Sequence, residues 1–233
     1  MITGQELISS LLHLFYPHTC PGCGNDMMAR DVLVCPRCIA SLPATYFEGI
    51  AGNPVEKRFW GRLPLEQASA TYFFTKQSVM QHLMHELKYK GNKDLGLFLG
   101  RLMADHWLKS NNFLPTALIP LPLHPTRERQ RGYNQATLLC QGMAELLRIP
   151  VITDAVIRST RTETQTKRGR VERWQNMEGK FAVIRPELIE GHHVCLVDDV
   201  ITTGATLEAC GSAVLQSNNI PLSVACLCYA TRM

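Results

Sequence analysis

The chain has 233 residues, of which 45% are hydrophobic and 19% charged, a composition typical of a folded globular protein and unlike a disordered one. The net charge of +4 is unevenly spread, because residues 121–175 carry ten basic and five acidic side chains whereas residues 176–233 carry three and six. The basic segment favours an anionic partner, either a phosphorylated metabolite or a nucleic acid. No apolar stretch approaches the roughly 18 residues that cross a bilayer, and no signal peptide is recognisable, so we expect no membrane insertion and a cytoplasmic location.

The hydrophobic spacing predicts a short amphipathic helix over residues 5–15, then a Cys-rich segment and a Pro- and Gly-rich stretch. From about residue 68, strands alternate with helices. Strands are expected at Ala70–Thr75, Ala117–Pro120, Phe181–Ile184, Val194–Val197 and Leu222–Tyr229, and helices at Val79–Tyr89, Leu95–Leu108, Ala136–Leu147 and Thr206–Gln216. This alternation predicts an α/β domain with a largely parallel sheet flanked by helices.

Four of the nine cysteines form two Cys-x-x-Cys pairs, Cys20 with Cys23 and Cys35 with Cys38. Each pair can form a tight turn that directs two thiolates at one ion, and Gly24 follows the first turn, where a positive φ is often needed. Four thiolates at this spacing are typical of a closed, structural zinc site. Two disulfides or a redox Cys-x-x-Cys pair are the alternatives, and the two neighbouring pairs favour zinc.

The other five cysteines stand in apolar helical or strand patterns. We expect them to be small buried hydrophobic residues. They are Cys140, Cys195, Cys210, Cys226 and Cys228.

The segment His193–Leu207 joins an apolar run, two carboxylates, a Thr- and Gly-rich loop and the start of a helix. Ligands of parallel sheets bind beyond the carboxyl ends of the strands, where Asp198 and Asp199 are expected. Carboxylates accept hydrogen bonds, which suits the adjacent hydroxyls of a ribose or a divalent metal. Amides at a helix N-terminus bind phosphate, and Gly204 permits close approach of the backbone. The segment therefore predicts a ribose-phosphate site.

Two other interpretations of this segment compete. An apolar run that ends in Asp-Asp also resembles a Walker B strand, but the required G-x-x-x-x-G-K-[ST] loop is missing, since Gly179-Lys180 is followed by Phe181. An Asp cap before an ordinary helix would leave the second carboxylate and the Thr-rich loop unexplained.

Two further segments are basic. In Ile119–Gln135 a Pro-rich turn precedes a basic loop with Arg127, Arg129 and Arg131, and Asn134 is a plausible helix cap. Arginine presents a fork that matches phosphate oxygens, and a solvated loop is the alternative. In Thr162–Phe181 and just before it, six basic residues face only two acidic ones, which is compatible with a lid over an anion, a nucleic-acid surface or a plain surface loop.

The run D-D-V-I-T-T-G-A-T, from Asp198 to Thr206, resembles the signature of type I phosphoribosyltransferases, which bind 5-phosphoribosyl-1-pyrophosphate (PRPP). The resemblance implies that Asp198 and Asp199 are the catalytic pair that holds the ribose hydroxyls. It also implies that the following loop cradles the 5′-phosphate through Thr202, Thr203, Gly204, Ala205 and Thr206.

Five features, spread over nearly the whole chain, together resemble the ComF family. They are the cysteine pairs, a Leu-Lys-Tyr segment at Lys88, the P-L-H…R-G-Y-N-Q run, the T-x-x-Q…R-x-x-N-x-x-G-x-F run and the D-D loop. The resemblance implies an N-terminal helix and four-Cys zinc finger in residues 1–45, a connector in 46–67 and a type I phosphoribosyltransferase-like domain in 68–233. Mg²⁺ would accompany PRPP. The pyrophosphate and lid contacts would be Lys88, Arg127, Arg131 and Arg173.

The ComF resemblance implies a role in natural transformation, DNA uptake or the use of external DNA. One hypothesis is an enzyme that transfers phosphoribose from PRPP to an acceptor. The alternative is a non-catalytic adaptor that binds single-stranded DNA, with basic side chains and aromatic stacking platforms, or a competence protein such as a helicase. The candidate platforms are Phe47, Phe59, Trp60 and Trp174. A conventional base-salvage enzyme would have no use for the cysteine module.

Overall fold

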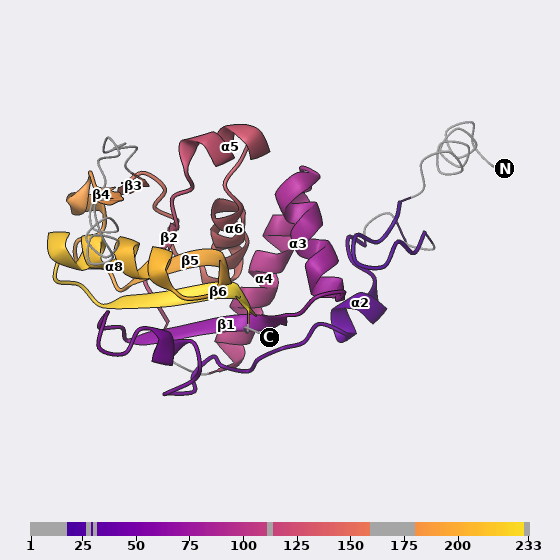
Figure 1. Ribbon diagram of the computed structural model, residues 1–233, viewed down its shortest axis with the longest axis horizontal. Helices are drawn as coiled ribbons and strands as arrows, with labels where there is room; N and C mark the ends of the chain where they lie inside the picture. Colours follow the sequence, from indigo (N-terminus) through magenta and orange to yellow (C-terminus); the bar gives the residue numbers. More distant parts are fainter. Residues whose placement is uncertain (1–17, 27–28, 30–31, 111–113, 159–179, 231–233) are drawn as a thin grey trace, which may run out of the picture.

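The computed structural model describes residues 18–26, 29, 32–110, 114–158 and 180–230 (Figure 1). The helix expected over residues 5–15, most of the segment Thr162–Phe181 and the candidates Arg173 and Trp174 lie outside the described residues. The elements in chain order are α2 (Pro36–Ala40), η1 (Glu56–Arg58), β1 (Gln67–Phe74), α3 (Val79–Tyr89), α4 (Lys93–Lys109), β2 (Ala117–Pro120), α5 (Pro125–Arg131), α6 (Gln135–Leu147), β3 (Val156–Arg158), β4 (Phe181–Val183), η2 (Pro186–Leu188), β5 (Val194–Ile201), α8 (Ala205–Ser217) and β6 (Leu222–Ala230).

The main sheet has four parallel strands in the order β1-β6-β5-β2, and β3 pairs with β4 in a separate antiparallel sheet. Side chains of β5 alternate between two cores: Cys195 and Val197 face α3, α4 and α6, whereas Val194 and Leu196 face α8 and the segment around η1. Alternation with both faces buried is the pattern of a sheet covered on both sides by helices. The predicted α/β fold with a helix-flanked parallel sheet is thus confirmed (Figure 1).

Strand β5 runs four residues further than the sequence predicts, through both aspartates to Ile201. The neighbouring strand β6 remains paired with it up to Ile201 opposite Tyr229, whereas β2 ends at Pro120 opposite Val197. Asp198 and Asp199 therefore lie beyond the end of β2 but beside β6. This step in the sheet edge opens a recess next to the carboxylates.

Helix α5 forms where the sequence suggests a basic loop. His124 caps its start by accepting a hydrogen bond from the amide of Thr126, Pro125 occupies its first position and Gly132 ends it with φ of 76°. These are ordinary start and stop signals, but none of the helix residues is buried, so no hydrophobic periodicity reveals the helix.

The segment before β1 packs into the core. Val55 and Phe59 are fully buried on the α8 side of the sheet. The side-chain amide of Asn53 donates to the carbonyl oxygens of Ile50 and Ala68 at 2.9 and 2.8 Å, which ties the segment to β1. Within the described ranges, no helix is long and apolar enough to span a membrane.

Candidate metal centre and ligand cleft

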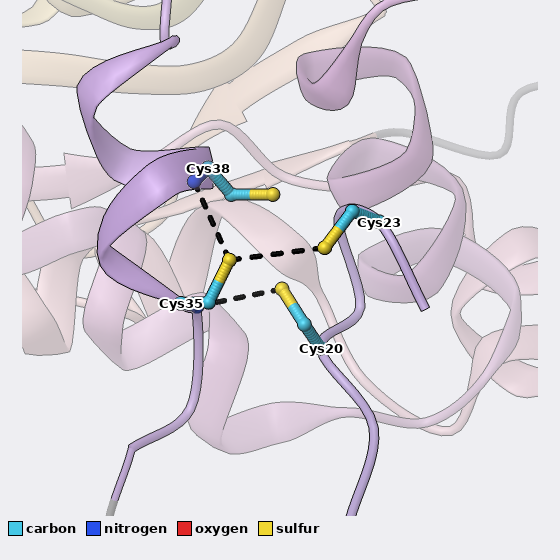
Figure 2. Close-up of side chains that lie close together, drawn as sticks. All are labelled: Cys20, Cys23, Cys35 and Cys38. Carbon is cyan, nitrogen blue, oxygen red and sulfur yellow. Dashed lines mark hydrogen bonds between the residues drawn. The ribbon is translucent and has the colours of Figure 1, made fainter. Parts of the chain in front are cut away.

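The four cysteines of the two Cys-x-x-Cys pairs converge on one point. Their sulfur atoms all lie within 4.8 Å of one another, and the Sγ atoms of Cys23 and Cys35 are 3.7 Å apart (Figure 2). A tetrahedral zinc site with Zn–S bonds of about 2.3 Å has sulfur–sulfur edges of about 3.8 Å. All four thiols are free, so the disulfide alternative is not realised. The four-Cys cluster fits a structural metal ion.

The backbone around the cluster is shaped for this convergence. Gly24 has φ of 72°, as the sequence suggests, and its amide donates to the carbonyl of Cys20 at 2.8 Å. The amides of Cys35 and Cys38 donate to the sulfurs of Cys20 and Cys35, both at 3.4 Å, and Cys35 caps α2 (Figure 2). Burial raises the pKa of the Cys20 thiol, but hydrogen bonds from backbone amides outweigh it and bring the pKa to about 7. Such N–H donors stabilise the thiolate that binds a metal.

The remaining five cysteines are all fully buried within helices and strands of the α/β domain, which confirms the expectation from their apolar surroundings. Burial raises the pKa of each of these thiols, so they remain protonated and unreactive.

A cleft of about 540 Å³ lies at the carboxyl ends of the strands, between the sheet edge, α3 and α5. It gathers residues from β5, the loop after it, α3, α5, β3 and the start of α6. Of the residues predicted from sequence, Lys88, Arg127, Arg131, Asp198, Asp199, Thr202 and Thr206 line it. Residues 203–205 complete the loop between the last two.

The two aspartates have distinct surroundings. Asp199 forms an ion pair with Lys88, whose Nζ lies 2.8 Å from Oδ2, and the two side chains are 14% and 22% exposed. Asp198 accepts a hydrogen bond from the amide of Asp199 at 2.7 Å. Burial and the neighbouring charge of Asp199 raise the pKa of Asp198 to about 8, although that hydrogen bond, Lys88 and Arg158 oppose the shift. A cationic ligand beside Asp198 would favour its ionised form.

The loop after β5 leads directly into α8. Gly204 stands before the helix with φ of 80°, and the amide of Ala205 is 3.4 Å from Oγ1 of Thr203. A Cβ atom on Gly204 would lie 3.1 Å from the ring of Phe59, so the loop packs closely on the segment around η1. The loop thereby presents hydroxyls and the N-terminal amides of a 13-residue helix at the cleft.

Four cations line the same cleft as the aspartates. Lys88 comes from α3, Arg127 and Arg131 from α5, and Arg158 from the end of β3. Burial and the neighbouring charge of Arg127 lower the pKa of Arg158, against the opposing effect of Asp198. Two guanidinium groups are thus held near each other at the cleft, an arrangement that favours an anion.

Sequence reasoning assigned no individual role to two residues of this cleft. Arg158 was grouped with the basic segment that follows it, but it belongs to β3 and lines the cleft beside Asp198. Tyr89 is 66% exposed at the rim, with the Arg131 guanidinium 5.7 Å from its ring centroid and the His85 ring 5.1 Å away. Tyr89 belongs to the Leu-Lys-Tyr segment of the family resemblance, and its i, i+4 spacing to His85 is a second local signal of the pair.

Comparison with known proteins places the chain in a family. It is 30% identical over 203 residues to the DNA utilization protein YhgH of Shigella flexneri, with 85% of each chain covered. It is 31% identical to competence protein F of Haemophilus influenzae, with 84% of each chain covered. The chain belongs to the ComF family. Competence protein ComFC of Bacillus subtilis, another relative, is 26% identical over 85% of this chain and 72% of its own length.

No protein-family model matches the chain. Among solved structures, it is similar to glutamine PRPP amidotransferase from B. subtilis complexed with ADP and GMP, at 18% identity and a TM-score of 0.43, over 61% of this chain and 30% of that one. Trypanosoma cruzi hypoxanthine phosphoribosyl transferase matches at 18% identity and a TM-score of 0.36, over 60% of this chain and 65% of that one.

Proposed function

We propose that this ComF protein binds PRPP in the cleft beside Asp198 and Asp199. The observation that carries the proposal is the juxtaposition of two carboxylates, a Thr- and Gly-rich loop at a helix N-terminus and four cations around a single cleft. Carboxylates suit sugar hydroxyls, the loop suits a phosphate, and the cations suit a pyrophosphate. PRPP has all three groups on one molecule.

In this proposal, the loop of residues 202–206 holds the 5′-phosphate, and Asp198 and Asp199 accept hydrogen bonds from the ribose hydroxyls. Asp199 now pairs with Lys88 at 2.8 Å, so the bound ribose competes for that carboxylate. Lys88 is then free to turn toward the pyrophosphate, together with Arg127, Arg131 and Arg158 from the other walls.

Mg²⁺ fits the same cleft, because hard cations prefer oxygen ligands and the two aspartates are the carboxylates among the described lining residues. When bound, the ion supplies charge neutralisation to the pyrophosphate. In the transfer reaction, the bond between C1 of the ribose and the pyrophosphate oxygen breaks with its electron pair leaving on pyrophosphate, and an acceptor nucleophile bonds to C1. The arginines and Lys88 stabilise the leaving charge, and the carboxylates hold the oxocarbenium-like sugar.

We propose zinc as the ion of the four-Cys cluster, since four sulfur ligands at tetrahedral spacing leave no open coordination position. We also propose a cytoplasmic protein that acts in DNA uptake or the use of external DNA. The names of the relatives support this proposal, as do the nine cysteines, which form no disulfide and so suit a reducing compartment.

Calorimetric titration of the zinc-loaded protein with PRPP, with and without Mg²⁺, tests the central proposal. We expect binding that is strengthened by Mg²⁺ and weakened by about 10- to 150-fold in Asp199→Asn, because a charge-assisted hydrogen bond is worth about 1.5–3 kcal/mol. The matched control is Asp154→Asn, which removes an exposed carboxylate paired with Arg185 outside the cleft lining. An unchanged affinity in Asp199→Asn would exclude this ribose site.

A second candidate function, binding of single-stranded DNA, is favoured by one exposed aromatic side chain. Trp60 is 62% exposed, and the Nζ of Lys57 lies 5.8 Å from its ring centroid. Phe59 is buried, and Phe47 packs edge-on against Phe73, so neither of these is a stacking platform. Fluorescence anisotropy with an oligothymidine should show affinity that falls steeply with salt and drops on Trp60→Ala. A flat salt response would exclude this function.

A further inference from the structure

Two faces of helix α3 line two different sites. Gln81, Met84, His85 and Lys88 follow helical spacing and line the cleft. His82 and Glu86, four residues apart on another face, border the groove beside the cysteine turns. Within the described part of the chain, α3 is the helix that lines both of these sites. Figure 1 shows its first turn beside the four-Cys module and its last turn near α5.

The start of α3 is clamped to the metal centre through Gly22. A Cβ atom on Gly22 would lie 2.9 Å from Sγ of Cys38 and 2.9 Å from Cγ1 of Val79, so the glycine lies tightly between a metal ligand and the helix. Nδ1 of His82 is 3.0 Å from the carbonyl oxygen of Gly22. The first cysteine turn therefore cannot change shape without pressing on or releasing α3.

The end of α3 is clamped to the cleft. Lys88 pairs with Asp199 at 2.8 Å, and the hydroxyl of Tyr133 donates to the carbonyl of Leu87. Between the two clamps, Leu83 and Leu87 are fully buried in the core, which holds the helix against the sheet. A helix of 11 residues is about 16 Å long, and its continuous backbone hydrogen bonds connect its first turn to the turn that carries Lys88.

We propose that α3 couples metal binding at the four cysteines to PRPP binding in the cleft, with His82 as a positioning residue for Lys88. The inference rests on the proposed PRPP function and on a metal in the four-Cys cluster. The metal fixes the first cysteine turn, and that turn positions α3 through Gly22 and His82. Helix α3 in turn positions Lys88, which contacts Asp199 in the free chain and pyrophosphate in the complex. Coupling of this kind is reciprocal, so PRPP must also tighten metal binding.

The test compares PRPP affinity in the zinc-loaded and metal-free full chain by calorimetry. We expect zinc removal to weaken PRPP binding at least fivefold, the lower range of typical coupling. In Lys88→Gln, whose PRPP affinity is already reduced, zinc removal should have little further effect, because the coupled side chain is gone. A full additional loss in Lys88→Gln would overturn the route through α3.

Zinc-loaded variants avoid the danger that metal-free protein unfolds. His82→Ala keeps every metal ligand and should weaken PRPP binding about three- to tenfold, the effect of one hydrogen bond. The matched control is His18→Ala, which removes a ring nitrogen 2.9 Å from the carbonyl oxygen of Val32 and leaves the α3 contact intact. We expect no change in PRPP affinity for His18→Ala. Equal effects of the two variants would overturn the proposal.

The rate of zinc transfer to a chromogenic chelator gives a second readout that a purely structural role of His82 would not alter. PRPP should slow zinc release from the wild-type chain and leave the rate unchanged in His82→Ala. Slowing of equal size in both proteins, or in neither, would overturn the coupling. Absence of PRPP binding to zinc-loaded wild type would instead reject the proposed function, so the two failures are distinguishable.

Discussion

The two ends of α3 face two clusters of acidic groups, thiols at one end and carboxylates at the other. The two clusters differ in what balances their negative charge. At the four-Cys cluster, the sulfurs lie close to one another and accept hydrogen bonds from backbone amides, and burial and neighbouring thiols raise the pKa of Cys38. At the cleft, Asp199 is paired with Lys88, and Arg158 acts on Asp198. The four cysteines need a bound metal ion to neutralise the negative charge of their thiolates. The cleft, in contrast, already contains lysine and arginine side chains that offset the charge of its carboxylates.

This difference predicts different responses to an absent ligand. Without an ion, the two turns of a four-thiolate site are joined by only a few weak contacts, such as the one from the Cys35 amide to the Cys20 sulfur, so we expect the module to depend on metal for its structure. The cleft keeps its shape without a ligand, because Lys88 and Asp199 neutralise each other. Its ligand has to displace an internal ion pair, and binding therefore selects molecules that offer both hydroxyls and anionic oxygens.

The largest expected effect comes from Cys38→Ser, which removes one buried metal ligand. Bound zinc, measured by elemental analysis, should fall from about one per chain to near zero, and limited proteolysis should cut within residues 18–42. Cys210→Ser is the control, since Cys210 is equally buried but lies outside the cluster, so it should lose stability and keep its zinc. Full zinc retention in Cys38→Ser would contradict the metal centre.

A smaller effect is expected from Gly204→Ala in the phosphate loop. The substitution places a Cβ at φ of 80° and 3.1 Å from Phe59, which should cost about 1–2 kcal/mol of unfolding free energy and weaken PRPP binding. Gly191→Ala is a matched control, because Gly191 has φ of 74° and open space around the added Cβ. Urea denaturation and calorimetry should show a similar backbone cost for the control with PRPP affinity unchanged. Loss of PRPP affinity in both variants would show that the effect is not local to the loop.

The last expected effect concerns pH. The pKa of Asp198 is raised in the fold to about 8, so between about pH 4 and pH 8 the folded chain binds more protons than the unfolded chain at this group. This contribution to stability is present at low pH and is lost as the pH rises through that window. Asp198→Asn is neutral at every pH and can still accept the hydrogen bond from Asp199. The melting temperature of the variant should therefore gain on wild type between pH 5 and pH 8, and parallel curves would refute the raised pKa.

Local spacing in the sequence was sufficient to predict the four-Cys cluster, the positive φ of Gly24, the cap at Asn134 and most element limits. Each of these depends on contacts between residues close in the chain, where the identity and spacing of a few side chains restrict the backbone. Helix α5 was not predicted, because a helix without buried residues has no periodic pattern of hydrophobic residues in its sequence.

The cleft depended on the tertiary fold. The ion pair between Lys88 and Asp199 joins residues on α3 and β5 that are far apart in the chain, and Arg158 at the end of β3 lines the same cleft as Asp198 and influences its pKa. The same holds for the clamp of Gly22 between Cys38 and Val79. The sequence specifies which groups are available, but their distances follow from how the strands pair and how α3 packs on the sheet, because long-range packing has no signature in local spacing.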